Sequence, residues 1–316
     1  MNYDDKIKKR TLETILLIVI MSLYTIFGLY YIPYILLLFP APFIAYSIKN
    51  GIIPNIINMI ITGIIVGLVD SFGATIILLI AFIPITFVSS YLIKKRRSNA
   101  EILGISAAVF FISILIILSF VDAGGGGFIA LLEEGFKQLL SAQLEMIEDM
   151  DLTSYQFLEA KELLENAYKY LLLIIPAILL IMSLVVSYLN CLLASVGLKK
   201  MGIGIINIPK FSRFRLPNNV IPGIIVMFLG VYIMNKLEMP YYETVLINLV
   251  VLVGFMFIIQ GLSVVDYFFI KIRIFPLIRV ILYLLFLFNS PIVTVISILG
   301  FIDTIFDLRR IKKSKS

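Results

Sequence analysis

The sequence contains no histidine and no tryptophan, and Cys191 is the single cysteine among its 316 residues. Without histidine there is no imidazole for a Ser-His-Asp triad, for general acid–base catalysis or for a metal site. A single cysteine also excludes disulfide bonds within the chain and thiolate metal clusters. Most classes of enzyme are therefore excluded, and we expect no catalytic residues, no cofactor and no metal site.

Charged residues are also scarce. Soluble domains carry about 25% charged residues, whereas this chain has 15% and is 61% hydrophobic. Its mean hydropathy is +1.06, and several apolar runs reach the length of about 18 or more residues that a membrane-spanning helix needs. The composition predicts an all-α, polytopic transmembrane helix bundle with about 8 to 10 membrane segments, embedded as a multi-pass protein in a cell membrane.

The first apolar run covers roughly residues 12–32 and follows a basic stretch, as the core of a signal peptide would. We interpret it as a retained helix, because it is long and no Ala-x-Ala-like cleavage site follows. The other crossings are expected at roughly 33–48, 52–69, 74–93, 101–121, 171–197, 219–235 and 244–270. The last apolar run, roughly 276–308, must turn back at Asn289-Ser290-Pro291, either as two short spans or as a re-entrant hairpin.

Basic residues give the orientation. Alternating crossings place 21 of the 26 Lys and Arg residues in the cytoplasm, together with both termini; the exceptions are Lys137, Lys161, Lys169, Lys236 and Arg279. The net charge of +6 then favours contact with anionic lipid and says nothing of nucleic acid. The lipid bilayer is the first expected partner.

The chain is expected to have three parts: an N-terminal transmembrane bundle of about five spans (1–121), an acidic extracytoplasmic helical hairpin (122–170), and a C-terminal bundle with a basic cytoplasmic loop and tail (171–316). The hairpin segment holds ten acidic side chains and three lysines. A four-glycine run, residues 124–127, is interpreted as its flexible hinge rather than as a phosphate-binding loop.

The hairpin has the pattern of an amphipathic helix followed by a second helix. Its apolar stripe consists of Phe128, Leu132, Phe136, Leu139, Leu140, Leu144, Ile147 and Met150. The motif Thr153-Ser154-Tyr155-Gln156 is a capping box that predicts the start of the second helix, which runs into the next span with a kink expected at Pro176. The stripe packs on this second helix, lies on the outer membrane surface, or binds another protein.

Polar side chains at membrane depth are costly, so they mark candidate sites. The candidates for a polar pocket within the bundle are Asn58, Asp70, Asn190 and Gln260, of which Gln260 is the deepest. Gly63 and Gly67 form a G-x-x-x-G motif that predicts close helix packing. Asp303 and Asp307 share one helical face and are expected to pair with Arg309, Arg310 or the basic tail rather than to bind a metal.

The segment 209–217 is the most motif-like stretch of the chain, because two prolines frame two aromatic and three basic residues: Lys210, Phe211, Arg213, Phe214 and Arg215. Such a loop serves as a topology determinant, or it has a specific role in binding lipid phosphates or an acidic partner.

The run Ser187-Tyr188-Leu189-Asn190, followed by Pro209, Phe211 and Arg213-Phe214-Arg215-Leu216-Pro217 after an acidic outer hairpin, resembles the YybS-like family of uncharacterised bacterial membrane proteins. The resemblance covers nearly the whole chain. It implies kinship of fold with the S components of energy-coupling-factor transporters and with the cell-shape protein MreD. The segment with Gly63, Gly67 and Asp70 is similar to a glycine-and-aspartate helix end of that wider group.

Two functions follow from this resemblance. The first is an S-component-like part that binds or transports a small molecule and docks on a separate energising module, because the chain has no P-loop. S components use an Ala-x-x-x-Ala face on the first span, and here that spacing occurs at Ala41 and Ala45 in the second. The second is a non-transporting membrane scaffold for envelope or division proteins, as the likeness to MreD implies. Neither function fixes an oligomeric state.

Overall fold

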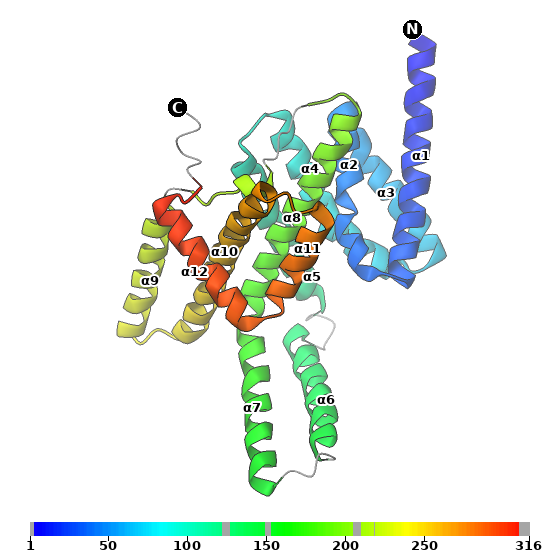
Figure 1. Cartoon of the computed structure of the whole chain (residues 1–316). Helices are drawn as coiled ribbons and strands as arrows, with labels where there is room; N and C mark the ends of the chain where they lie inside the picture. Colours follow the sequence, from blue (N-terminus) through cyan, green and yellow to red (C-terminus); the bar gives the residue numbers. More distant parts are fainter. Residues whose placement is uncertain (1–2, 122–126, 149–152, 205–209, 218, 310–316) are drawn as a thin grey trace. The chain divides into compact units, whose positions relative to one another are not determined.

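The computed structural model describes residues 3–121, 127–148, 153–204, 210–217 and 219–309. Every regular element in these ranges is helical, which confirms the all-α, polytopic bundle (Figure 1). Most of the four-glycine run, the stripe residue Met150 and the tail from residue 310 lie outside the described residues.

The chain forms two compact units, and each is described by itself. The first unit contains Met1–Asp149 and Met182–Ile208, and the second contains Met150–Ile181 and Pro209–Ser316. These units divide the acidic segment 122–170 that the sequence suggests as one part, because its first helix belongs to the first unit and its second helix to the second unit. The helix α8 (Ile175–Lys200) contributes residues to both units.

The first unit is built from six α-helices, one 3-10 helix and most of α8. The elements are α1 (Tyr3–Tyr30), the 3-10 helix η1 (Pro33–Leu38), α2 (Pro40–Asn50), α3 (Ile52–Val69), α4 (Phe72–Lys94), α5 (Asn99–Val121) and α6 (Phe128–Glu148). Turn residues set the boundaries: Gly51 has φ 113°, which only glycine adopts readily, and Ser71 caps α4 by accepting a hydrogen bond from Ala74 N. The predicted spans at 52–69 and 74–93 coincide with α3 and α4.

The second predicted crossing, 33–48, runs back beside α1 as a broken segment. Tyr24 donates a hydrogen bond to the carbonyl of Ile35, and the hydroxyls of Thr14 and Tyr46 are hydrogen-bonded. Further along, Lys49 Nζ lies 2.7 Å from Glu13 Oε2. Residues later in η1 and α2 thus pair with residues earlier in α1. Pro40 at the start of α2 separates the two pieces, because proline suits the first helical turn and not the interior.

Two apolar clusters fill the first unit. One joins Phe39, Phe43, Phe82 and Phe110 with other buried side chains of α1–α5 and α8. The other joins Ile44, Ala45, Ile93, Cys191 and Leu198. Both Ala41 and Ala45 are buried inside the unit, so this pair does not form an exposed docking face.

The second unit consists of α7 (Ser154–Leu173), the first turns of α8, the 3-10 turn η3 (Phe211–Arg213), α9 (Val220–Lys236), α10 (Tyr242–Lys271), α11 (Pro276–Leu287) and α12 (Ser290–Phe306). The capping box at Thr153 is present, with the Thr153 side chain accepting from Gln156 N and the Gln156 side chain accepting from Thr153 N. The last apolar run turns where the sequence predicts: the path bends by 108° between α11 and α12, and Asn289 caps α12.

Within the described residues, six helices are long and apolar enough to cross a membrane, and the bent pair of α11 and α12 raises this to seven if it is one span. The six are the Ile7–Tyr30 part of α1 together with α3, α4, α5, α8 and α10. The sequence suggests eight crossings before the final pair. The difference arises because α2 has only 11 residues and α9 only 17.

The side chain of Asn248 bridges the break between the helices α7 and α8. The helix is interrupted at Ile174, two residues before Pro176. In an unbroken helix Ala177 N would bond to Leu173 O. Instead Asn248 Oδ1 accepts from Ala177 N at 2.8 Å, and Asn248 Nδ2 donates to Leu173 O at 2.7 Å. One side-chain amide therefore satisfies both backbone groups that the break leaves without their helical partner.

Two glycines set the close crossing of α10 and α12. A Cβ added to Gly261 would lie 2.8 Å from the carbonyl carbon of Ile296, and one added to Gly300 would lie 2.6 Å from Gly261 N. Both obstacles are backbone atoms, which cannot move without separating the helices. The two backbones therefore approach each other as closely as small residues permit.

We expect Gly261→Ala and Gly300→Ala each to lower the free energy of unfolding in detergent by about 2 kcal/mol or more, because the added methyl group forces the two helices apart. The matched control is Gly254→Ala on the same helix, where a Cβ meets nothing within 4 Å. This control should be neutral or slightly stabilising. Equal unfolding midpoints for all three variants would contradict the close crossing.

Candidate functional site

A small cavity lies inside the first unit between α1, α3, α4 and Phe39, the residue that joins η1 to α2. Its lining residues are Thr25, Leu29, Phe39, Thr62, Gly63, Val66, Ala74, Thr75 and Leu78, and the cavity has room for about one water molecule. None of these nine side chains is charged. Three hydroxyl groups, from Thr25, Thr62 and Thr75, supply the polar part of the wall.

Several polar groups near this cavity lack hydrogen-bond partners among the described residues. Thr75 Oγ1, in the wall, has none, and neither do Ser22 Oγ and Asn58 Nδ2, which lie one helical turn from Thr25 and Thr62. All three residues are buried. Buried polar groups are nearly always bonded, so these groups mark a place where hydrogen-bonding capacity is left over. The predicted pocket residue Asn58 is part of this set.

The predicted pocket residue Asn190 lies elsewhere in the first unit and holds α8 to η1. Its Nδ2 donates to Leu37 O at 2.8 Å and to Val186 O at 2.8 Å. Ser187, one turn earlier on α8, donates to Leu103 O of α5 at 3.1 Å. This arrangement fixes α8 against its neighbours and does not line the cavity.

The other predicted residues of the first unit are placed at the cavity or at a helix end. Asp70 is exposed at the C-cap of α3 and accepts a hydrogen bond from Tyr30 OH at 3.0 Å, so it is not part of a buried pocket. Gly63 lines the cavity, and a Cβ there would lie 2.8 Å from a methyl group of Leu79 on α4. A Cβ added to Gly67 would lie 2.7 Å from the ring of Phe72.

The fourth predicted pocket residue, Gln260, belongs to the second unit. It does not line the cavity but is hydrogen-bonded to the basic loop. Its Oε1 accepts from Leu216 N at 3.0 Å, and its Nε2 donates to Asp303 Oδ2 at 2.6 Å. Gln260 is fully buried. Its amide therefore connects three segments: the loop 210–217, α10 and α12.

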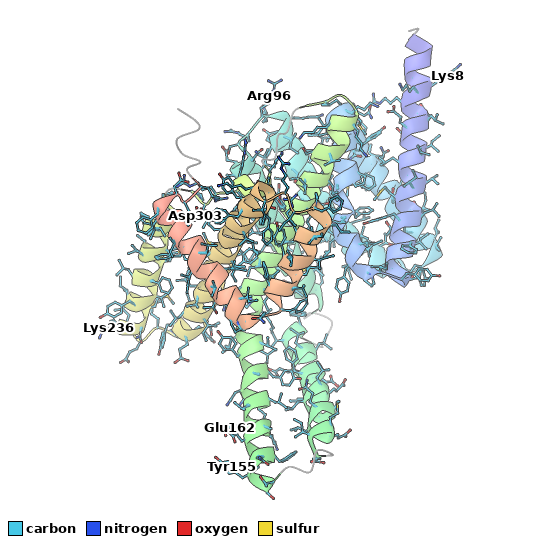
Figure 2. All side chains as sticks on the ribbon, viewed as in Figure 1. Lys8, Arg96, Tyr155, Glu162, Lys236 and Asp303 are labelled. Atoms are coloured by element: carbon cyan, nitrogen blue, oxygen red, sulfur yellow. The ribbon has the colours of Figure 1, made fainter. Side chains whose placement is uncertain are left out.

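Arg309 completes this network from just beyond α12. Its guanidinium lies 2.8 Å from Asp303 Oδ2 and also donates to Ser212 O, Phe214 O and Ser263 Oγ (Asp303 is labelled in Figure 2). Both partners of the ion pair are almost completely buried, with side-chain exposures of 0% and 1%. The pairing of Asp303 with Arg309 that the sequence predicts is thus observed. A buried charge is tolerated only when it is paired and hydrogen-bonded in this way.

Ser263 and Asp266 extend the polar face of α10 that begins at Gln260. Ser263 Oγ donates to Phe211 O at 2.6 Å. Asp266 Oδ1 lies 2.5 Å from Arg279 Nη1 of α11 and accepts from Tyr283 OH. The spacing of three residues places these side chains on one side of the helix. Arg279, an exception to the predicted charge distribution, is thereby neutralised close to the basic end of α10.

The five predicted loop residues divide into two groups. Phe211, Phe214 and Arg215 are partly buried, and Arg215 lies 3.6 Å from Asp307. Lys210 and Arg213 are exposed, and neither has an ion-pair partner within the described part of the chain. The loop is therefore held by its backbone while two of its cations face outward.

Sequence reasoning missed Ser212, Ser263 and the pairing of Asp266 with Arg279. The available signal was the polar series Gln260, Ser263 and Asp266, spaced like one face of a helix in an otherwise apolar span. The choice of Gln260 as a buried polar residue was informative, but its partners could not be named because they lie 43 and 44 residues away.

Removing one partner of the buried ion pair should leave the other charge unpaired, so we expect Asp303→Asn and Arg309→Gln each to cost about 3–5 kcal/mol of unfolding free energy. Unfolding of the purified protein in mixed micelles measures this. The control is Glu101→Gln, which breaks the exposed Arg97–Glu101 pair (3.6 Å) and should cost less than about 1 kcal/mol. If the buried and exposed pairs gave equal losses, the network would not be a principal support of the second unit.

Comparisons with known proteins agree with this architecture. Residues 15–304 match the model of a family described as predicted membrane protein (DUF2232). The uncharacterised protein YybS of Bacillus subtilis (strain 168) is 25% identical over 304 residues, which cover 92% of this chain and 95% of that protein. No solved structure matches. The predicted resemblance to the YybS-like family is confirmed, and the chain belongs to the DUF2232 family of membrane proteins.

Proposed function

We propose that this protein is a membrane-embedded binding component for a small, uncharged polar molecule, and that it depends on a separate partner for any energised step. The observation that carries the proposal is the cavity with its hydroxyl-lined wall and the unpartnered buried groups of Ser22, Asn58 and Thr75. Hydroxyl and amide groups in an apolar surround recognise a ligand by hydrogen bonds, and they disfavour an ionic ligand because no counter-charge is present in the wall.

The cavity is small in the described conformation, so binding requires a helix to move. Of the three helices that line the cavity, α1 is the least buried, with 22% of its spanning segment buried against 39% for α3 and for α4, so we take α1 to be the one that moves. It contributes Thr25 and Leu29 to the wall, so an outward shift of α1 enlarges the cavity without disturbing the contacts between α3 and α4. Ligand binding then stabilises the wider state, as a population shift.

The charge distribution supports a role for the basic side in contacting a partner. In the second unit, Asn248 near the start of α10 holds the end of the acidic helix α7, whereas Gln260 and Ser263 near its other end hold the basic loop. The acidic and basic features therefore lie toward opposite ends of one membrane-spanning helix. By the positive-inside rule the basic end is cytoplasmic, where an energising module would dock.

A scaffold for envelope or division proteins is the second candidate. The observation in its favour is a set of large apolar side chains on α7, Tyr155, Leu158 and Leu163, which are 76%, 62% and 65% exposed. Apolar groups on an otherwise acidic helix suit contact with another protein.

Mass spectrometry of the protein purified from its native membrane in mild detergent separates these two functions. We expect one stoichiometric small molecule, and we expect Thr62→Val and Thr75→Val each to weaken its binding about fivefold, the effect of one lost hydrogen bond. The isosteric control is Thr294→Val on α12, whose hydroxyl donates to Ser290 O as that of Thr62 donates to Asn58 O, but whose side chain does not line the cavity. Envelope proteins recovered without any ligand, and lost on deletion of residues 128–165, would instead support the scaffold.

Cysteine labelling tests the orientation. Cys191 is buried and is replaced by Ala to give a cysteine-free background. A membrane-impermeant maleimide applied to intact cells should then label Glu162→Cys and Lys236→Cys, and it should label Lys8→Cys only after permeabilisation (all three positions are marked in Figure 2). Labelling of Lys8→Cys in intact cells would reverse the proposed orientation.

A further inference from the structure

We propose that the turn Lys210–Arg213 binds the phosphate of an anionic lipid headgroup. The turn is a 3-10 helix in which Arg213 N donates to Lys210 O at 2.8 Å. This hydrogen bond closes a turn, which brings the Cα atoms of Lys210 and Arg213 within about 7 Å of each other, so both long side chains can reach one anion. A phosphate group that bridges them receives two charge-assisted contacts.

The turn is rigid because Arg309 and Ser263 donate hydrogen bonds to its carbonyl groups. Arg309 donates to Ser212 O at 2.7 Å and to Phe214 O at 2.9 Å, and Ser263 Oγ donates to Phe211 O at 2.6 Å. Three carbonyls of one short turn thus point toward α10 and Arg309. The backbone is fixed before any ligand arrives, which reduces the entropy lost on binding.

The four basic residues at this loop fall into two pairs, one in internal ion pairs and one exposed. Arg309 and Arg215 are neutralised by Asp303 and Asp307, at 2.8 Å and 3.6 Å. Lys210 and Arg213 are exposed and have no acidic partner in the described ranges. If the loop only marked topology, its cations would need no fixed geometry. Here Arg309 and Arg215 form ion pairs within the protein, whereas Lys210 and Arg213 are exposed and can bind an external anion.

The depth of the turn selects lipid as the source of the anion. Its anchors Gln260 and Ser263 lie 11 and 8 residues before the end of α10 at Lys271, which is about 16 and 12 Å along the helix. A helix of 30 residues is about 45 Å long and spans the hydrocarbon and both headgroup layers. With the hydrocarbon core centred on α10, about 7 Å of its end lies in the headgroup layer, so these anchors lie about 5 to 9 Å inside the hydrocarbon boundary. The long side chains of Lys210 and Arg213 can extend from there to the lipid phosphates, whereas an acidic peptide would have to enter the membrane to reach the turn.

Aromatic side chains flank the turn in a manner consistent with this position. The rings of Phe211 and Tyr283 are 6.2 Å apart, and Tyr283 in turn stacks on Phe269 of α10. Aromatic residues concentrate at the headgroup region of membrane proteins. The flexible stems of Lys210 and Arg213 can extend from here to the phosphate layer.

The test is native mass spectrometry of the full chain in detergent, titrated with phosphatidylglycerol, with phosphatidylcholine, or with soluble glycerol 3-phosphate. The test variant is Lys210→Gln with Arg213→Gln, and the matched control is Lys199→Gln with Lys200→Gln, which removes two exposed cations from α8. We expect phosphatidylglycerol affinity to fall roughly thirtyfold in the test variant and to stay unchanged in the control. Phosphatidylcholine binding should be unaffected, and glycerol 3-phosphate should not compete.

A second variant tests the fixed geometry. Ser263→Ala retains both cations but removes the hydroxyl that holds Phe211 O, so we expect a several-fold loss of phosphatidylglycerol affinity with an unfolding transition that remains cooperative. The glutamine variant should unfold at the wild-type midpoint, because neither side chain makes an internal ion pair. Equal losses in the test and control variants would show general charge attraction and overturn the proposal. Competition by glycerol 3-phosphate or by an acidic peptide would also overturn it, by showing a water-soluble occupant.

Discussion

The second unit depends on a single guanidinium group, that of Arg309. A buried cation inside an apolar protein is stable only if its charge is neutralised and most of its donors are bonded. Asp303 neutralises Arg309, and Asp303, Ser263 and two loop carbonyls accept from its Nη1 and Nη2, while Nε has no partner among the described residues. Because Gln260 shares the same Asp303 oxygen, the loop, α10 and α12 are connected through one carboxylate. The close crossing at Gly261 and Gly300 brings α12 near enough to α10 for this contact.

The two units use polar groups in different ways. In the first unit, the buried polar side chains are hydroxyls and amides, and several retain unused hydrogen-bonding capacity beside a cavity. In the second unit, buried charges are paired internally: Asp303 with Arg309 and Asp266 with Arg279. Unused neutral groups suit a reversible ligand, whereas paired charges suit a rigid support. This contrast is the reason that we propose ligand binding for the first unit and an exposed lipid-binding turn for the second.

Local sequence patterns were sufficient for the helices but not for their partners. The boundaries of α3 and α4, the capping box at Thr153 and the turn at Asn289 all follow from residues adjacent in sequence. The pairing of Asp303 with Arg309 was also accessible, because only six residues separate them. By contrast, Asn248 bonds to Leu173, which is 75 residues away in the sequence, and no local pattern predicts such a contact. The same holds for Gln260: its neighbours in sequence do not show that it bonds to Leu216, so it was predicted to line a pocket. The predicted segment 219–235 matches α9, but the division of the segment 33–48 into η1 and α2 escaped prediction, since hydropathy measures apolar length and not where Pro40 interrupts it.

The long sequence separation between Ser212 and Arg309 has a consequence for biosynthesis. Ser212 is made 97 residues before the guanidinium that holds its carbonyl, an interval of about 5–20 s at ordinary translation rates. Ser263, which donates to Phe211 O and Phe214 O, follows them by only 52 and 49 residues. Ser212 O therefore receives its donor later than the carbonyls on either side of it. The network of the second unit is therefore complete only after Arg309 has been made.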